Sequence, residues 1–240
     1  MTTFQKIVKY GALIFAGYLC LMILTGIIVG ITAMIGITTG VEVLQEDSSS
    51  EIITAWEQEY ANISEMDIDL SICKLDIRKG DTLKVNVSDI SDRFKCEANG
   101  SKLKIEDKHL NRNFLNMHNI TPTVVIYVPE NMQFEKVSID TGVNDTNIEY
   151  LKTNKLDVDM GVGKVTLTSE VLKNADIECG VGKLELNLVG EQENYRINAE
   201  AGLGNFEIAG QKVSNHQTFG NGNALIKIEA GIGEVIVNFK

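Results

Sequence analysis

The sequence predicts an all-β fold: a single-stranded β-solenoid with glycine corners, preceded by one transmembrane helix. The first observation is a repeated phrase of acid, any residue, Gly, any residue and Gly. Its copies begin at Asp159, Glu178, Glu200 and Glu229, and the first three recur at about the interval of one coil in a repeat protein. The second is an alternation of apolar and polar residues from Met66 onward, which is typical of strands with one buried face. The third is an uncharged apolar stretch over 10–41.

The apolar stretch is predicted to be a membrane span. It is longer than the roughly 20 apolar residues that cross a bilayer, and longer than the apolar region of about 7–15 residues in a cleavable signal peptide. We therefore expect a retained anchor over 10–41, with a signal peptide as the alternative. Lys6 and Lys9 precede it and acids follow it, so the tail 1–9 is predicted to be cytoplasmic and the carboxyl-terminal domain extracytoplasmic. Gly26 and Gly30 have the spacing of a helix-pairing motif, which leaves homo-oligomerisation open.

Residues 42–65 are predicted to form a juxtamembrane linker that contains a short helix. Ser48 and Glu51 fit a capping box. The apolar residues that follow fall near helical spacing: Ile52, Ile53, Trp56 and Tyr60. We therefore expect a helix over 51–61, packed on the end of the folded domain or lying against the lipid headgroups.

The extracytoplasmic domain, 66–240, is predicted to consist of strands. Turn signals at Gly80-Asp81 and Asn99-Gly100 separate its first alternating runs. Pro122 and Pro129, the two prolines of the chain, flank the run 124–128, where loss of a backbone donor does least harm. No helical pattern of useful length interrupts this region.

The repeats predict stacked coils whose corners are made by glycine. A coil of about twenty residues cannot bury its apolar face alone, but stacked coils cover one another. Glycine allows positive φ and close stacking at each corner. An earlier copy begins at Asp140 and has Asn144 in place of the second glycine, which predicts positive φ there too. The longer final interval predicts an enlarged loop over 215–223, and loops of this kind often carry binding function.

The net charge excludes one class of partner and disfavours another. The chain has 22 basic and 33 acidic residues; without Lys6 and Lys9 this leaves 20 against 33, a net charge of −13 beyond the tail. Nucleic-acid binders carry basic stripes, so nucleic acid is not expected as a partner. Long-range attraction to anionic lipid or wall polymer is disfavoured for the same reason.

Cysteine and histidine give no prediction of a metal or redox site. Cys20 lies in the predicted span, and Cys179 occupies an inward position where we expect a buried free thiol. A disulfide between Cys73 and Cys96 is possible, and the sequence does not decide whether it forms. The three histidines, His109, His118 and His216, lie in separate loops without acid or cysteine at metal-ligand spacing.

The acids of the repeated phrase are predicted to form a row along one side of the stack. The row would contain Asp140, Asp159, Glu178, Glu200 and Glu229, about 4.8 Å apart. Calcium or interleaved lysines would relieve their repulsion, and Lys164 and Lys183 lie close by in sequence. One carboxylate per coil is too few for calcium, which takes several oxygen ligands. We therefore predict a solvated row, and no catalytic, cofactor-binding or metal residues.

Together, the amino-terminal span, the strand Val124-Val125-Ile126-Tyr127-Val128-Pro129 and the glycine repeats resemble the bacterial "putative adhesin" or toastrack family of domains of unknown function. The resemblance covers 66–240. It implies a β-solenoid protein of the bacterial cell envelope, and it carries over no site residues.

The predicted function is a non-catalytic scaffold, sensor or regulator in the cell membrane, which contacts lipid through its span and an envelope or membrane protein through its solenoid. One alternative is a bactofilin-like structural polymer, because the terminal strand Val235–Phe239 ends without an evident cap. A polysaccharide-active enzyme and an adhesin are weaker alternatives. A carbohydrate-cleaving site needs converging acids, whereas here the acids are spread one per coil.

Overall fold

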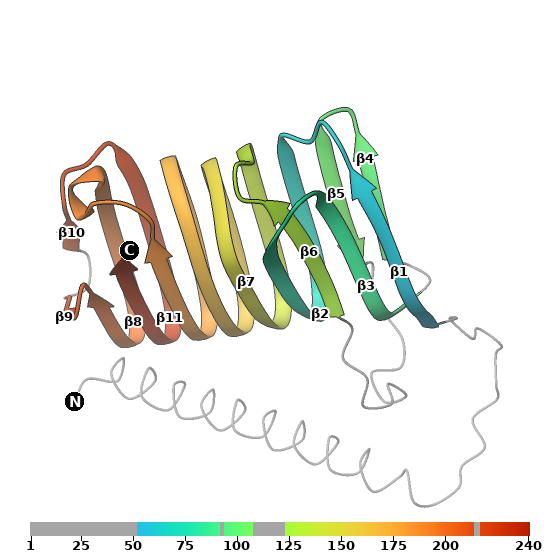
Figure 1. Cartoon of the computed structure of the whole chain (residues 1–240). Helices are drawn as coiled ribbons and strands as arrows, with labels where there is room; N and C mark the ends of the chain where they lie inside the picture. The colour runs from blue at the N-terminus through green and yellow to red at the C-terminus, as the bar shows by residue number, and fades with distance from the viewer. Residues whose placement is uncertain (1–51, 92–93, 108–122, 214–216) are drawn as a thin grey trace, which may run out of the picture. The chain divides into compact units, whose positions relative to one another are not determined.

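The computed structural model describes residues 52–91, 94–107, 123–213 and 217–240 (Figure 1). These residues are nearly all β-structure, as predicted, and they belong to one unit, Ser50–Lys240. The elements are β1 (Ile52–Tyr60), β2 (Glu65–Gly80), β3 (Leu83–Ser91), β4 (Phe94–Asn99), β5 (Lys102–Asp107), β6 (Thr123–Pro129), β7 (Gln133–Leu188), the 3-10 helix η1 (Gln192–Asn194), β8 (Tyr195–Ile208), β9 (Gln211–Lys212), β10 (Gln217–Phe219) and β11 (Ala224–Phe239).

The predicted span, 10–41, lies outside the described residues. Within the described ranges, we find no helix with the length and apolar character that crossing a membrane requires.

The centre of the unit is a stack of parallel coils formed by β2, β7, β11 and β8 (Figure 1). β7 runs without interruption for 56 residues and winds through successive coils. The coils are in register: Asp69 of β2 pairs with Asp140 of β7, and Glu229 of β11 pairs with Glu178 of β7 on one side and Glu200 of β8 on the other. Each coil therefore covers the next, as the repeats predict.

The order of the last two coils differs from the prediction of sequential stacking. β11 follows β8 in the chain but lies between β7 and β8. The end of β11, Val235–Phe239, was predicted to be an uncapped edge; instead Val235 pairs with both Leu184 and Phe206. The corner glycines Gly161, Gly180 and Gly202 share one column, in which Gly231 lies between Gly180 and Gly202.

At its amino-terminal end the stack opens into two sheets that share β2. The first half of β2 pairs with β5, which pairs with β4, and the second half pairs with β6, followed by β3 and β1. The prediction of a helix over 51–61 is wrong, since Ile52–Tyr60 is a strand antiparallel to β3. Trp56 and Tyr60 are four residues apart, which fits one face of a strand as well as one helical turn. Both side chains pack against the core between the two sheets.

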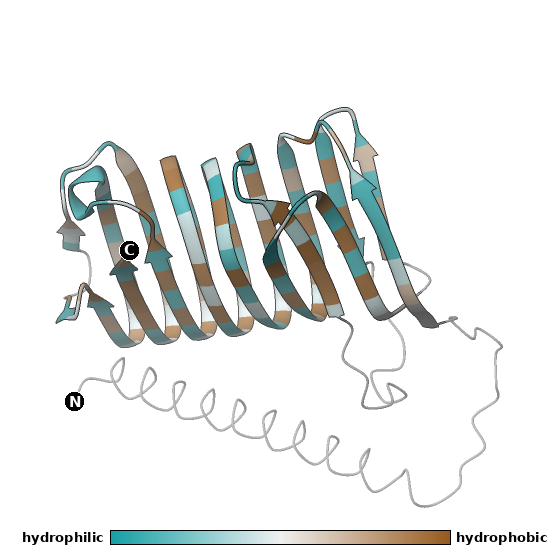
Figure 2. Ribbon diagram, viewed as in Figure 1, coloured by the Kyte–Doolittle hydropathy of each residue, from teal (hydrophilic) through white to brown (hydrophobic). Residues whose placement is uncertain are grey.

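The interior of the stack is filled by alternate residues of each strand (Figure 2). Ile68, Ile139, Ile177, Ile197 and Ile228 are among these buried side chains. Cys179 is buried and free, as predicted, and Cys73 and Cys96 are also free, so they do not form the bridge that the sequence left open. Burial raises the pKa of the Cys73 thiol to about 12 and that of Cys96 to about 11, so both are protonated at neutral pH.

Candidate functional site: an acid row beside an aliphatic ridge

The corners of the coils bring the repeated phrases into contact. The second glycine of the phrase has φ of 148° at Gly163 and 146° at Gly182, a region that favours glycine. A Cβ atom at Gly182 would lie 1.8 Å from the carbonyl oxygen of Gly163, so glycine is needed there for space as well. The first glycine is needed for space alone, because a Cβ at Gly161 would lie 2.5 Å from the carbonyl oxygen of Gly142.

Asn144 does not have the positive φ that was predicted for it. In the described ranges, the residues other than glycine with positive φ are Asn62 and Ala209. The side chain of Asn144 is buried, and its amide nitrogen and oxygen have no hydrogen-bond partner. The corner of this early coil therefore follows a different backbone path from the corners that end in glycine.

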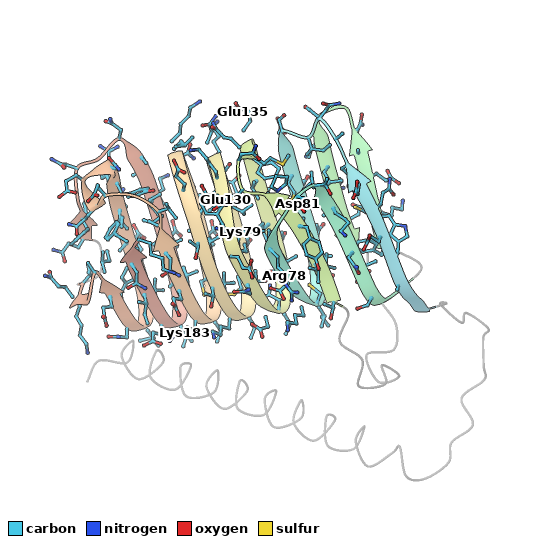
Figure 3. The ribbon with its side chains drawn as sticks, in the orientation of Figure 1. Arg78, Lys79, Asp81, Glu130, Glu135 and Lys183 are labelled. Carbon is cyan, nitrogen blue, oxygen red and sulfur yellow. The ribbon has the colours of Figure 1, made fainter. Side chains whose placement is uncertain are left out.

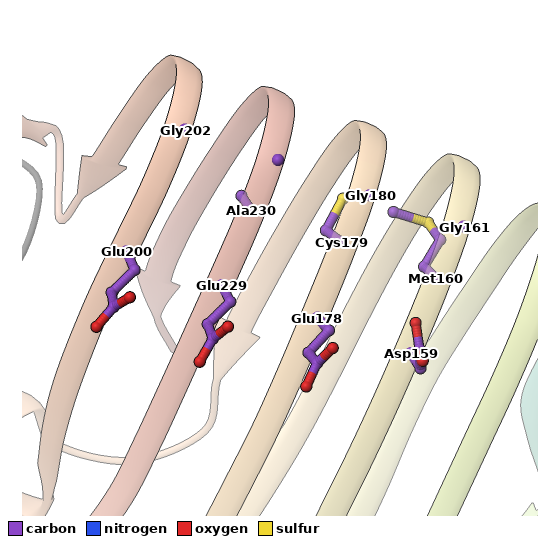
Figure 4. Close-up of a pocket in the computed structure, with 11 residues that line it drawn as sticks. Asp159, Met160, Gly161, Glu178, Cys179, Gly180, Glu200, Gly202, Glu229 and Ala230 are labelled. Carbon is purple, nitrogen blue, oxygen red and sulfur yellow. The ribbon is translucent and has the colours of Figure 1, made fainter.

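The acids of the phrases form a row across the coils, and Figure 4 shows four of them side by side. We define the acid row, in its spatial order, as Asp69, Asp140, Asp159, Glu178, Glu229 and Glu200. Sequence reasoning missed Asp69. Its phrase, Asp69-Leu70-Ser71-Ile72-Cys73, pairs residue by residue with 140–144 but has small residues in place of both glycines. The spacing of acid and small residues was the signal that could have found it.

The lysines that were predicted to relieve the acid row do not do so. Lys183 forms its ion pair with Glu234 at 2.7 Å, beyond the corner (Figure 3). In the part of the chain that the structure describes, Asp140, Asp159, Glu178 and Glu229 form no ion pair. Burial raises the pKa of Asp140, and the nearby carboxylates of Asp159, Asp69 and Asp67 raise it further. Repulsion among these four acids is therefore not relieved by an ion pair within the described residues.

Two acids that lie two residues before members of the acid row are paired with lysine. Lys102 binds Asp67 at 2.6 Å, and Lys136 binds Asp157 at 2.7 Å. Elsewhere, Asp76 is buried and accepts hydrogen bonds from Arg78 at 2.6 Å and Asn147 at 2.9 Å. Burial alone would raise the pKa of Asp76, but these two partners outweigh it and hold the pKa below its ordinary value. Four acids of the row, Asp140, Asp159, Glu178 and Glu229, thus differ from these acids in forming no ion pair with the residues that the structure describes.

A groove of about 510 Å³ runs along the acid row (Figure 4). Its walls include Asp159, Glu178, Glu229 and Glu200, and its floor is formed by glycines together with Met160, Cys179 and Ala230. The glycines form a column without side chains between the acids and the corner. The groove therefore exists because each phrase has glycine directly after its inward residue.

Beyond the glycine column stands a second row, of aliphatic residues. We define the aliphatic ridge as Val143 (51% exposed), Val162 (47%), Val181 (44%), Ile232 (54%) and Leu203 (71%). Each of these residues is the central one of its corner, where the tight turn gives it no inward position. Ile232 pairs with Val181 and with Leu203, so the ridge follows the same spatial order as the acid row. The sequence showed an aliphatic residue in every copy, but the alternation of a strand does not tell which way a corner residue points.

The site carries no cluster of metal-binding side chains in the described ranges. No three His, Cys, Asp or Glu side chains come together there in an arrangement that could hold a metal ion. His109, His118 and His216 lie outside the described residues, so their predicted separation is not tested. The chemistry that the described surface offers is an exposed apolar strip beside a strip of negative charge.

The fold and the surface together define a β-repeat protein: parallel coils, glycine corners and one face that carries regular rows of side chains. The chain belongs to the Toastrack DUF4097 family, whose model matches residues 63–215. No protein of curated function matches the chain.

Solved structures give the same picture of the fold. The crystal structure of a "putative cell adhesion protein" from Clostridium sporogenes aligns with a TM-score of 0.58 at 16% identity, covering 78% of this chain and 99% of that one. A "putative adhesin" from Bacteroides fragilis aligns with a TM-score of 0.35 at 14% identity, covering 79% and 98%. A "putative lipid binding protein" from Parabacteroides distasonis aligns at 0.27 and 16%, covering 78% and 96%. At these identities the likeness concerns the fold alone, and it rests on the first structure.

Proposed function

We propose that this protein is a membrane-anchored, extracytoplasmic binding module of the bacterial cell envelope, which acts without catalysis as a scaffold, sensor or regulator through protein contacts. The observation that carries the proposal is the aliphatic ridge. Exposed aliphatic residues are normal when scattered, but a contiguous row of them on a regular scaffold is typical of an interaction site. The corners hold the ridge in place, because the glycines of each corner are in contact with the neighbouring coil.

The proposed location follows from the amino-acid sequence. The apolar stretch 10–41 is long enough to remain as an anchor, and the charges that flank it favour a cytoplasmic amino terminus. The mass of the membrane-extracted protein tests retention of the stretch, since cleavage after it would remove the first forty residues. Labelling of a cysteine introduced at exposed Lys212 with a membrane-impermeant maleimide, in intact cells, tests the orientation.

The protein-contact proposal is tested by photo-crosslinking in intact cells. A photoreactive amino acid replaces Leu203, the most exposed residue of the ridge, or Leu172, which is 38% exposed and lies off the ridge. We expect a covalent adduct with another protein from position 203 and not from position 172. If neither position 203 nor position 181 gives an adduct with any protein, the proposed function is wrong.

The polymer alternative is less well supported. End-to-end stacking would need open strand edges at both ends of the stack, and the outer edge of β8 is already paired with β9 and β10. At the other end, β2 is covered by β5 on one side of its corner and by β6 on the other. β5 and β6 run parallel to β2 and are themselves covered by the antiparallel strands β4 and β3, which leave little room for a parallel coil from another copy.

A further inference from the structure

We infer that the aliphatic ridge and the acid row together form the docking surface for one kind of partner, a basic amphipathic helix of another protein. This inference deepens the proposed function and rests on it. The two rows run side by side across the same coils, separated by the glycine column. A partner that covers the ridge therefore also faces the acids.

The charge of the partner follows from charge complementarity. Four acids of the row, Asp140, Asp159, Glu178 and Glu229, form no ion pair with the described part of the protein, and the pKa of Asp140 is raised first by burial and then by the neighbouring carboxylates. An approaching segment with lysine or arginine would relieve this repulsion, whereas an acidic segment would increase it. An anionic lipid surface is disfavoured for the same reason.

The secondary structure of the partner follows from the spacing of the rows. Neighbouring coils are about 4.8 Å apart, so a segment lying along the ridge must present one side chain at about that interval. A helix presents one per turn, at about 5.4 Å. A strand presents side chains of one face every two residues, at about 6.7 Å. The helix stays close to register over the ridge, whereas a strand loses register within two or three coils.

The length of the partner follows from the same spacing. The five residues of the ridge span about four intervals, or about 19 Å, which corresponds to roughly 13 residues of helix. A strip of this width and length suits one helix. It is too narrow for a second copy of the chain, since each partner of a stable dimer buries about 800 Å².

The test measures binding of a synthetic helix to the full-length protein in nanodiscs of zwitterionic lipid, with empty nanodiscs as the blank. The probe is a fluorescent peptide of about 14 residues with leucine along one stripe and lysine beside it. One comparison peptide has glutamate in place of lysine, and the other has the same composition in scrambled order. We expect the lysine helix to bind at least about tenfold more tightly than either, and more weakly at high salt.

Two double variants and two matched controls locate the binding. Glu178→Gln with Glu229→Gln removes charge from the row, and Val181→Ser with Ile232→Ser removes apolar surface from the ridge. All four positions are exposed, so the fold should persist, which thermal unfolding checks. We expect each pair to weaken binding by roughly three- to tenfold. The controls, Glu193→Gln and Leu172→Ser, are exposed but lie off both rows, and we expect less than about a twofold change.

The outcomes separate this inference from the proposed function. Equal binding of the three peptides would overturn the inference of a basic helix as the partner, even if crosslinking from position 203 captures a protein. The same holds if neither the double variant in the acid row nor the one in the aliphatic ridge weakens binding. A crosslink from position 203 to a second copy of the chain alone, or to lipid alone, would overturn it too. Absence of any protein adduct would overturn the proposed function instead.

Discussion

The two glycines of each corner are required for different physical reasons. Gly161 has an ordinary φ, and it is needed because a Cβ would approach the carbonyl of the preceding coil. Gly182 combines that close approach with a φ of 146°, which residues with a side chain rarely adopt. In the first two coils the second position is occupied by Cys73 and then by Asn144. Glycine with a positive φ is therefore required at this position only from Gly163 onward.

Gly182→Ala is therefore expected to destabilise the unit strongly. The added Cβ would overlap the carbonyl oxygen of Gly163, and neither backbone can move without breaking the stack. We expect a loss of about 3–5 kcal/mol in the free energy of unfolding, measured by urea denaturation of the unit Ser50–Lys240. The control is Gly100→Ala, where φ is 61° and no atom lies within 4 Å of the added Cβ. There we expect about 1–2 kcal/mol. Equal losses at both positions would show that φ alone, and not contact between coils, explains the requirement for glycine.

Asp140→Asn is expected to stabilise the protein at neutral pH. Burial and neighbouring carboxylates raise the pKa of Asp140 in the folded state. The folded protein therefore binds this proton more tightly than the unfolded chain, and wild-type stability falls as pH rises from the ordinary value of 3.8 through the raised pKa. Because Asp140 is exposed, the gain at pH 7 should be only about 0.2–0.5 kcal/mol.

The pH dependence of this gain in stability distinguishes relief of charge repulsion from a pH-independent effect of the introduced asparagine side chain. We expect the difference in unfolding free energy between Asp140→Asn and wild type to be smallest near pH 3 and largest above the raised pKa, at low ionic strength. High salt should reduce the difference, because the repelling carboxylates are screened. A difference that is constant from pH 3 to pH 7 would contradict the assignment.

At the scale of elements, the position of β11 is the main departure from the sequence prediction. The repeated phrase identifies a coil, but all coils have nearly the same phrase, so the phrase does not specify which coil lies beside which. A short connection forces sequential neighbours, whereas the long connection between β8 and β11 allows the chain to return to a different place. β11 fits between β7 and β8 because its corner glycines, Gly231 and Gly233, accept a coil on both sides.

The spatial order of the coils is tested with pairs of introduced cysteines. In a unit whose native cysteines are replaced, Glu178→Cys with Glu229→Cys and Glu229→Cys with Glu200→Cys place two thiols on adjacent coils, about 4.8 Å apart. Glu178→Cys with Glu200→Cys places them two coils apart. We expect mild oxidation to form a disulfide in the first two pairs and not in the third, as read by peptide mass mapping. A disulfide between positions 178 and 200, with none between positions 178 and 229, would instead show the sequential order; the pair at 229 and 200 is adjacent in both orders and serves as the positive control.

Periodicity predicted the strands, the inward residues and the corner glycines, because each depends on local sequence. Tyr60 shows where local sequence is insufficient. Its spacing from Trp56 fits a helix or a strand, and the choice is made by pairing with β3 and by a hydrogen bond from its hydroxyl to the Sγ of Cys96, at 3.0 Å. The acid row was predictable from the phrase, apart from Asp69. The exposure of the ridge and the absence of lysines from the row depend on how a corner turns, which the sequence pattern does not reveal.

At the scale of the molecule, antiparallel strands are added at both ends of the stack: β9 and β10 on β8, and β4 and β3 on the strands β5 and β6 that flank β2. At the carboxyl-terminal end, Phe219 of β10 stacks on Phe239 of β11, and the ring of Tyr195 lies 6.0 Å from that of Phe239. The Tyr195 hydroxyl donates a hydrogen bond of 2.6 Å to the carbonyl of Val189. A stack of parallel coils has exposed edges at its two ends, so these additions are where the protein limits association with itself.

Replacing the strands that cover β8 should therefore convert the protein into one that associates. We propose to replace Gln211, Lys212 and Gln217–Phe219 with Gly and Ser while keeping the length of the connection, so that β11 can still reach its place. The outer edge of β8 then loses its partners in β9 and β10. We expect wild-type unit Ser50–Lys240 to sediment as a monomer at all concentrations, and the variant to show concentration-dependent association. The aliphatic ridge is intact in both proteins, so association of the wild type would indicate association through the ridge. A variant that stays monomeric would contradict the prediction, because it would show that β9 and β10 are not needed to prevent association through β8.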